Sequence, residues 1–130
     1  MKRILIADDS PFIRDQLRIQ LQQRGAEVYE AKNGVEAVQK GAKIHPDLIV
    51  LDCQMPEMDG LHAARELHRM MPAVPLVMFA LDSNQYLAEE AQKTGIRALF
   101  PKTKFFHLLN WIEKQLQIGS STQAPLRGAA

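Results

Sequence analysis

The sequence predicts an α/β fold built on a parallel five-stranded sheet, and three observations support this. Short apolar segments alternate with segments whose apolar residues recur at helical spacing. The 130 residues are 46% hydrophobic and 24% charged, which is typical of one globular domain with its own core. No internal repeat interrupts this order. Strands that alternate with helices form parallel sheets with right-handed crossovers, so we expect helices on both faces.

The first strand is expected at residues 3–7, "RILIA", because a continuous apolar run suits a strand that is buried on both faces. Ser10 can cap the helix that follows, and Pro11 fits its first position. Apolar residues at helical spacing continue until Gly25, where glycine indicates the end of the helix.

The second strand is expected at residues 27–31, "EVYEA", and its polar character favours an edge of the sheet. The pair Asn33-Gly34 indicates a turn. A second helix follows and ends before Pro46, because proline disfavours helix in the residue before it. The third strand is expected at residues 48–52.

The fourth strand is expected at residues 76–80, "LVMFA". A third helix precedes it, beginning after Gly60 and ending where Pro72 and Pro75 stand. The next helix is expected to begin at Ser83 or Asn84, both of which can cap a helix, and to run to about Thr94.

The fifth strand is expected at residues 98–100, and Pro101 after it favours an edge position. A last amphipathic helix is expected at residues 105–116. From Gly119 onward the sequence is small and polar without periodicity. We therefore expect one domain over residues 1–118, and a tail over residues 119–130 that is disordered, a linker remnant or left over from cloning.

The composition indicates no general attraction to nucleic acid or membranes, because the formal net charge is only +1. No apolar stretch approaches the ~20 residues of a membrane span, and "MKRILIADDS" does not have the pattern of a signal peptide. Cys53 is the only cysteine, so an internal disulfide is excluded and a reducing compartment is favoured. We expect a cytoplasmic protein that itself binds neither nucleic acid nor membrane.

Charged side chains follow three of the predicted strands. The first strand is followed by Asp8 and Asp9, the third ends on Asp52, and Lys102 follows the fifth. In open α/β sheets ligands bind beyond the carboxyl ends of the strands. If the first and third strands are neighbours, the three carboxylates converge there with Lys102 beside them.

This set of residues has the parts for metal-assisted phosphorylation of an aspartate. Crowded carboxylates repel one another unless a cation intervenes, and oxygen ligands suit Mg²⁺ or Mn²⁺. An aspartate carboxylate can attack phosphorus, and a lysine can pair with a phosphoryl oxygen. Each residue also has a structural interpretation, since the acids can cap a helix and a lysine is commonly a surface charge. Their joint occurrence favours a site.

Four stretches carry a resemblance to a known family: "ILIADDS", "LIVLDCQMPEMDG", "PLVMFA" and "ALFPKTKF". Over residues 2 to about 117 the chain resembles the receiver domain of two-component response regulators, in particular chemotaxis regulators. The resemblance implies a flavodoxin-like (βα)5 three-layer sandwich with the strand order 2-1-3-4-5. A branch of the family with helix-turn-helix output domains is resembled more weakly, through "GIRALFPKTK".

The resemblance implies a role for each residue at the site. Asp52 would accept the phosphoryl group and Lys102 would contact it. Asp9 would bind the metal directly, Asp8 would assist, and Asp52 and the backbone carbonyl of Gln54 would complete the protein's ligands. The implied phosphoryl donors are a sensor histidine kinase, a phosphotransfer protein or a small acyl phosphate. Such a domain catalyses its own phosphorylation but turns over no separate substrate, so we do not expect an enzyme.

Three positions depart from the family pattern. Ala80 stands where the family usually has Thr or Ser, Leu99 where many members have Tyr or Phe, and Thr103 where Pro usually follows the lysine. Lys102 anchors this alignment; an alignment shifted by one residue would place Phe100 at the aromatic position. Because Ala80 offers no hydrogen-bond donor, we expect phosphorylation of Asp52 with atypical switching.

The sequence leaves other functions to be weighed. A phosphotransferase with a nucleophile after the first strand would have a D-x-D pair, and Ser10 follows Asp9 instead. A flavin binder would have a phosphate-binding glycine or hydroxyl loop where "DDSP" stands. A receiver-fold interaction module that works without phosphorylation is the main alternative, and a homodimer through the last helix and the fifth strand stays open.

Overall fold

The computed structural model describes residues 1–82 and 84–119 and has one parallel sheet with the strand order β2-β1-β3-β4-β5. This confirms the predicted order and the flavodoxin-like three-layer arrangement. The strands are β1 (Arg3–Ala7), β2 (Glu27–Ala31), β3 (Leu48–Leu51), β4 (Leu76–Ala80) and β5 (Ile96–Pro101). The helices are α1 (Pro11–Gln23), α2 (Gly34–Ile44), α3 (Gly60–Met70), α4 (Gln85–Lys93) and α5 (Phe105–Leu116).

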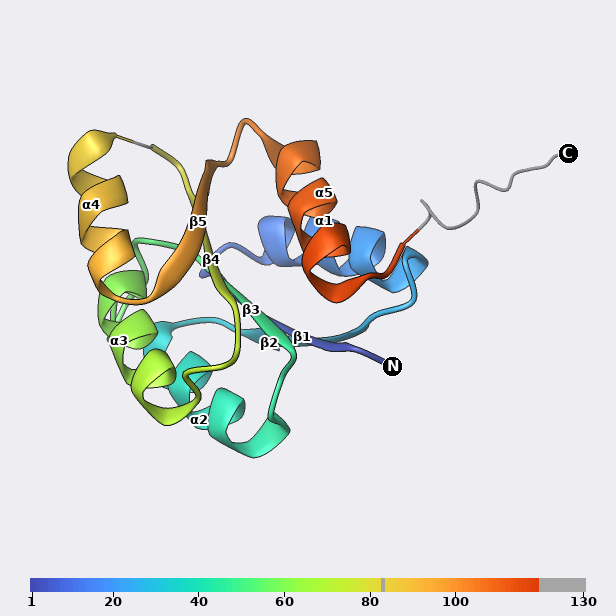
Figure 1. Cartoon of the computed structure of the whole chain (residues 1–130), viewed down its shortest axis with the longest axis horizontal. Helices are drawn as coiled ribbons and strands as arrows, with labels where there is room; N and C mark the ends of the chain where they lie inside the picture. Colours follow the sequence, from blue (N-terminus) through green and yellow to red (C-terminus); the bar gives the residue numbers. More distant parts are fainter. Residues whose placement is uncertain (83, 120–130) are drawn as a thin grey trace, which may run out of the picture.

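The helices form two layers. Helices α1 and α5 cover one face of the sheet, and α2, α3 and α4 cover the other (Figure 1). Along β1, Ile4 and Ile6 belong to the core on the α1/α5 side, while Leu5 and Ala7 belong to the core on the opposite side. Because both faces are covered, the strand is apolar at every buried position, as the continuous run predicted.

Polar side chains begin several of the helices. Ser10 Oγ accepts a hydrogen bond from the Ile13 N–H at 3.3 Å, and Pro11 occupies the first position of α1, as predicted. Asn33, which the sequence placed in a turn, caps α2, and Asn84, one of the two predicted caps, begins α4. The other predicted cap, Ser83, lies outside the described residues. An asparagine fits both roles because its side-chain carbonyl can satisfy a free backbone N–H group in a turn or at a helix end.

Strand β5 is longer than predicted, since it begins at Ile96 and includes Pro101. The pairing between β4 and β5 shifts register after Ile96, so that Arg97 is the extra residue of a bulge. Arg97 is exposed, which interrupts the apolar pattern by which strands are found in a sequence. The strand lies at the edge of the sheet, as predicted, where the absence of an N–H group on Pro101 is tolerated.

The pairing register brings the predicted site residues out at one edge. Ala7 pairs with Leu51, so Asp8 and Asp52 leave the sheet side by side. Ala80 pairs with Pro101, so Lys102 emerges next to the end of β4.

Two further sequence predictions concern membrane spans and the carboxyl-terminal tail. Within the part of the chain that the structure describes, no helix has the length and apolarity to cross a membrane. The predicted tail over 119–130 lies outside the described residues, apart from Gly119.

Candidate functional site

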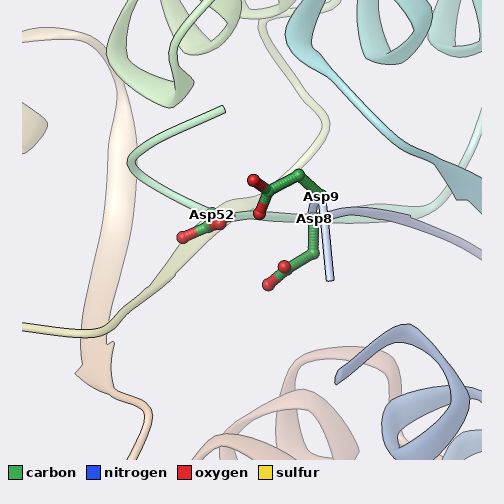
Figure 2. A group of neighbouring side chains, drawn as sticks. All are labelled: Asp8, Asp9 and Asp52. Atoms are coloured by element: carbon green, nitrogen blue, oxygen red, sulfur yellow. The ribbon is translucent and has the colours of Figure 1, made fainter. Parts of the chain in front are cut away.

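Three carboxyl groups meet at the carboxyl edge of the sheet (Figure 2). Asp8 and Asp9 follow β1 and Asp52 follows β3, and one carboxylate oxygen from each lies within 4.8 Å of the others. Asp8 and Asp52 are 2% and 5% exposed, whereas Asp9 is open to solvent. The backbone N–H of Asp52 donates to the Ala7 carbonyl at 2.8 Å, which holds the two loops together. The structure therefore brings together the acids that the sequence predicted.

Lys102 lies against the two buried acids. Its Nζ is 2.8 Å from Asp8 Oδ2 and 3.3 Å from Asp52 Oδ1. The backbone N–H of Lys102 donates to the Ala80 carbonyl at 2.7 Å, which extends the β4–β5 pairing to the lysine itself. The backbone thus places Lys102 beside the acids from the end of the edge strand β5.

The charges at this edge shift the proton equilibria. Burial, and then the neighbouring Asp8 charge, raise the pKa of Asp52 to about 6, although Lys102 opposes the shift. Burial would lower the pKa of Lys102, but its hydrogen bonds and charge interactions with Asp8 and Asp52 outweigh burial and raise it. At neutral pH Asp52 is ionised and more basic than an ordinary aspartate.

Asp8 and Asp9 differ in what they can still bind. Both carboxylate oxygens of Asp8 are engaged, since Oδ1 accepts from the Ser10 N–H at 2.9 Å and Oδ2 pairs with Lys102. Asp9, in contrast, has no hydrogen-bond or ion-pair partner among the residues that the structure describes. A small cation at this edge would therefore find free carboxylate oxygens mainly on Asp9 and Asp52.

The loop after β3 packs closely against the start of helix α3. A Cβ on Gly60 would lie 2.0 Å from the backbone oxygen of Asp52, so only glycine fits this position. The Gly60 N–H donates to the Cys53 carbonyl at 2.7 Å, and Asp59 Oδ1 caps α3 by accepting from the His62 N–H at 2.8 Å. The motif "PEMDG" therefore closes the loop tightly enough to hold the backbone around Asp52.

An open cleft of about 510 Å³ lies over the site, on the side of α4. Asp9, Asp52, Gln54, Ala80 and Lys102 all line it. The cleft supplies room for a ligand beside the acids, and Gln54, whose backbone carbonyl the resemblance implies as a metal ligand, is one of its lining residues. Asp8 is not among the residues that line the cleft; it is buried and pairs with Lys102.

The three departures from the family pattern occupy different environments. Ala80 is buried at the end of β4 and brings only a methyl group to the cleft. Leu99 is half-buried and packs with the core on the α3/α4 side. Phe100 faces the other layer, where its ring lies 6.3 Å from that of Trp111. Thr103 is exposed.

The segment after β1 that carries Asp8 and Asp9 is called the acidic loop below, and one residue that contacts it was not singled out from the sequence. Arg14, at the end of the first turn of α1, donates from Nη1 to the backbone carbonyl oxygen of Asp8 at 2.7 Å. Its partner is a backbone group and leaves no mark in the sequence. The only available signal was the position of an arginine one helical turn after Ser10 and Pro11.

Comparison with known families gives a match over most of the chain. A family model described as "Response regulator receiver domain" matches residues 4–112. The chemotaxis protein CheY of Thermotoga maritima is 34% identical over 118 residues, which cover 87% of this chain and 98% of the relative. A protein-glutamate methylesterase/protein-glutamine glutaminase of Methanosarcina mazei is 39% identical over 120 residues, which cover 89% of this chain. The match covers 33% of that enzyme, so this chain spans about a third of its length.

Solved structures give the same picture of the fold. A response regulator receiver domain protein from Methanospirillum hungatei has a TM-score of 0.85 and 26% identity, with 90% of this chain and 94% of that chain covered. The response regulator TrrA of Thermotoga maritima, solved in complex with Mg²⁺ and BeF, has a TM-score of 0.81 and 31% identity. That match covers 88% of this chain and 99% of TrrA.

Proposed function

The chain belongs to the response regulator receiver domain family, and we propose that it serves phosphorelay signalling by accepting a phosphoryl group on Asp52. The observation that carries this proposal is the convergence of three carboxylates and one lysine at the cleft. The buried charges of Asp8 and Asp52 oppose folding unless they are compensated, so a purely structural role does not account for them.

Asp52 is suited to be the nucleophile. Its carboxylate is ionised at neutral pH, and its raised pKa of about 6 makes it more basic than a free aspartate. A carboxylate oxygen forms the new bond to phosphorus while the bond between phosphorus and the donor breaks, and the leaving group departs with that electron pair. Lys102, already 3.3 Å from Asp52 Oδ1, is placed to pair with an oxygen of the transferred group.

The donor set fits Mg²⁺, with Mn²⁺ as an alternative, because it consists of hard oxygen ligands around an open cleft. Asp9, Asp52 and the backbone carbonyl of Gln54 would hold the ion, and Asp8 would assist from behind. When bound, the ion reduces the repulsion among the carboxylates and attracts a phosphoryl oxygen. The TrrA relative, whose structure contains Mg²⁺ and BeF, supports this assignment.

We propose that the response to phosphorylation is atypical. Ala80 cannot donate the hydrogen bond that a Thr or Ser would give to a phosphoryl oxygen, and one such bond to a charged acceptor contributes ~1–3 kcal/mol. Leu99 replaces the aromatic residue that many family members have on β5. If the missing hydroxyl matters, Ala80→Thr will enlarge the structural response to phosphorylation, measured as the change in backbone amide chemical shifts.

The proposed partners are a sensor histidine kinase or a phosphotransfer protein, as is usual for receiver domains. Homodimer formation and a cytoplasmic location stay predictions, as does the assignment of residues 1–118 as one domain. The domain needs no separate substrate in this scheme, since the acceptor belongs to the chain itself.

The second candidate function is a receiver-fold module that binds partners without phosphorylation. Ala80 and Leu99 favour it, because both positions lack the groups that would couple a phosphoryl group to the α4 side. The free carboxylate of Asp9 and the close approach of Lys102 to Asp52 count against it, since binding alone requires neither.

One experiment separates these functions. The protein is incubated with a small acyl phosphate and Mg²⁺, and its intact mass is followed beside Asp52→Asn and beside Asp15→Asn, a control at an exposed acid on α1. We expect wild type and Asp15→Asn to gain one phosphoryl group, and Asp52→Asn and metal-free wild type to gain none. Wild type that gains none would support the interaction module instead.

A further inference from the structure

Arg14 connects the acidic loop to the neighbouring edge strand. Its Nε donates to Glu30 Oε1 on β2 at 2.9 Å, and its Nη1 donates to the Asp8 carbonyl oxygen at 2.7 Å. The Arg14 side chain is only 17% exposed, so water competes little for these bonds. A guanidinium is a rigid planar fork, and two bonds in different directions therefore fix its orientation.

The carbonyl that Arg14 binds belongs to the peptide unit between Asp8 and Asp9. A peptide unit is planar, so fixing its carbonyl also fixes the direction in which the chain enters Asp9. On the other side, the Asp8 N–H donates to the Ala31 carbonyl at 3.1 Å. Asp8 is thus held through its N–H, its carbonyl and both carboxylate oxygens.

Asp9 has no such support of its own. Its carboxylate is exposed and has no hydrogen-bond or ion-pair partner among the described residues, yet it must approach Asp52 to share a cation. The position of Asp9 therefore depends on the backbone that precedes it. Two side-chain contacts orient that backbone. The bond from the Ser10 N–H to Asp8 Oδ1 lies within the loop, whereas the Arg14 bond ties the loop to β2 through Glu30.

We propose that Arg14 is a positioning residue for the cation site, which orients the Asp8–Asp9 peptide and thereby sets the affinity of Asp9 and Asp52 for Mg²⁺. This inference rests on the proposed function, because it assigns a determinant of the same site. Arg14 touches neither the cleft nor the reacting atoms. Arg14 changes the free energy of cation binding by orienting the acidic loop. Glu30 on β2 in turn holds Arg14 in place.

Arg18 offers a matched control. It lies one turn further along α1 and pairs with the same Glu30, at 3.2 Å, and with Asp15, but it makes no bond to the acidic loop. Arg14→Gln and Arg18→Gln therefore remove the same charge from the same helix. Only Arg14→Gln removes the contact with the Asp8 carbonyl.

The primary measurement is the Kd for Mg²⁺ without any phosphoryl donor, from amide chemical shifts around Asp9 and Asp52. We expect Arg14→Gln to raise the Kd about 10-fold, the size of effect seen when a residue that supports a metal ligand is removed. We expect Arg18→Gln to change it by roughly twofold or less, because exposed ion pairs contribute little. Equal effects of the two variants would overturn the proposal.

Arg14→Lys separates orientation from charge. A lysine restores the positive charge but cannot donate in both directions from a rigid fork. We expect its Kd to stay closer to that of Arg14→Gln than to wild type. Full recovery with lysine would show that charge alone is responsible and would contradict the proposed orientation of the peptide.

The phosphorylation rate at saturating Mg²⁺ distinguishes a loss of cation affinity from general damage to the fold. Because Arg14 acts on cation affinity, the rate for Arg14→Gln should approach the wild-type rate once the site is filled. A rate that stays low together with an unchanged Kd would overturn the proposal. If Arg14→Gln fails to fold, Glu30→Gln takes its place, since it weakens the support of Arg14 on β2. It also weakens the support of Arg18, and the Arg18→Gln variant controls for that second loss. An unchanged Kd would then count against the inference.

The outcomes also distinguish this inference from the proposed function. If wild type binds Mg²⁺ and is phosphorylated, but Arg14→Gln has the wild-type Kd, only the proposed role of Arg14 is disproved. Wild type that neither binds Mg²⁺ nor accepts a phosphoryl group would remove both.

Discussion

Two largely buried groups of charges lie at opposite ends of the sheet, and they are balanced differently. At the amino end, Arg24 at the end of α1 pairs with Glu113 of α5, one cation with one anion. At the carboxyl end, the single cation Lys102 contacts two buried carboxylates, Asp8 and Asp52. Their side chains are similarly withdrawn from water, between 3% and 15% exposed in both groups. The difference is therefore in charge balance rather than in burial.

The balance of charge separates a structural pair from a site. Arg24 also donates to the Gln20 carbonyl and side chain, both at 2.9 Å, so the guanidinium at the amino end has several partners. At the carboxyl end one negative charge exceeds the buried positive charge, and the exposed Asp9 adds a second. An excess of this kind opposes folding, and a divalent cation would relieve it.

The strongest way to break the carboxyl-end group is to remove its cation. Lys102→Met keeps the aliphatic stem but leaves Asp8 and Asp52 buried without a positive partner. We expect the metal-free protein to lose ~3 kcal/mol of unfolding free energy, the usual cost of breaking a buried pair from one side. Urea unfolding measures this, and Lys104→Met, which alters an exposed lysine two residues on, should be nearly neutral. A loss of similar size in both variants would show that Lys102 does not compensate the acids.

Removing one of the excess acids should instead raise the free energy of unfolding of the metal-free protein. The folded pKa of Asp52 is about 6, above its ordinary value of 3.8. Protonated Asp52 therefore favours the folded state. This contribution to the free energy of unfolding is fully present below pH 3.8 and is lost as the pH rises through 6. Above that pH the charged form opposes folding by ~2–3 kcal/mol, because each pKa unit corresponds to 1.36 kcal/mol.

Asp52→Asn should therefore stabilise the metal-free protein at pH 7.5, by up to the same ~2–3 kcal/mol. It should also flatten the dependence of unfolding free energy on pH between 4 and 7. Denaturant unfolding at several pH values tests both effects, and added Mg²⁺ should narrow the difference by stabilising wild type. Asp15→Asn is the control. A variant that is less stable than wild type at pH 7.5 would mean that Lys102 compensates Asp52 completely.

The sequence could predict the features that depend on local pattern or on strand order. Ser10 and Pro11 were found because a cap and a first-turn proline act on their own helix. The meeting of Asp52 with Lys102 was predicted because each residue directly follows a strand, and the family resemblance supplied the order of those strands. In a parallel sheet this order decides which strand ends are neighbours.

Contacts set by tertiary packing were not predicted. Arg24 and Glu113 are 89 residues apart, and their meeting depends on how far α1 and α5 extend beside each other. Arg14 binds a backbone carbonyl, a group that every residue has. At Arg97 a bulge turned a charged residue outward within β5 and concealed the start of the strand.

The amino-end pair gives the smallest expected effect and the sharpest contrast. Arg24→Met and Glu113→Gln, alone and combined, form a double-mutant cycle whose coupling energy should be of order 1 kcal/mol and stabilising. Because this pair is balanced and lies at the far end of the sheet from the acids, Mg²⁺ should leave the coupling unchanged. The same cycle on Lys102→Met and Asp52→Asn should give a coupling that shrinks when Mg²⁺ is added, since the cation then compensates the acids. A Mg²⁺-dependent coupling at Arg24 and Glu113 would mean that the two ends of the sheet are linked, and charge balance would no longer separate the structural pair from the site.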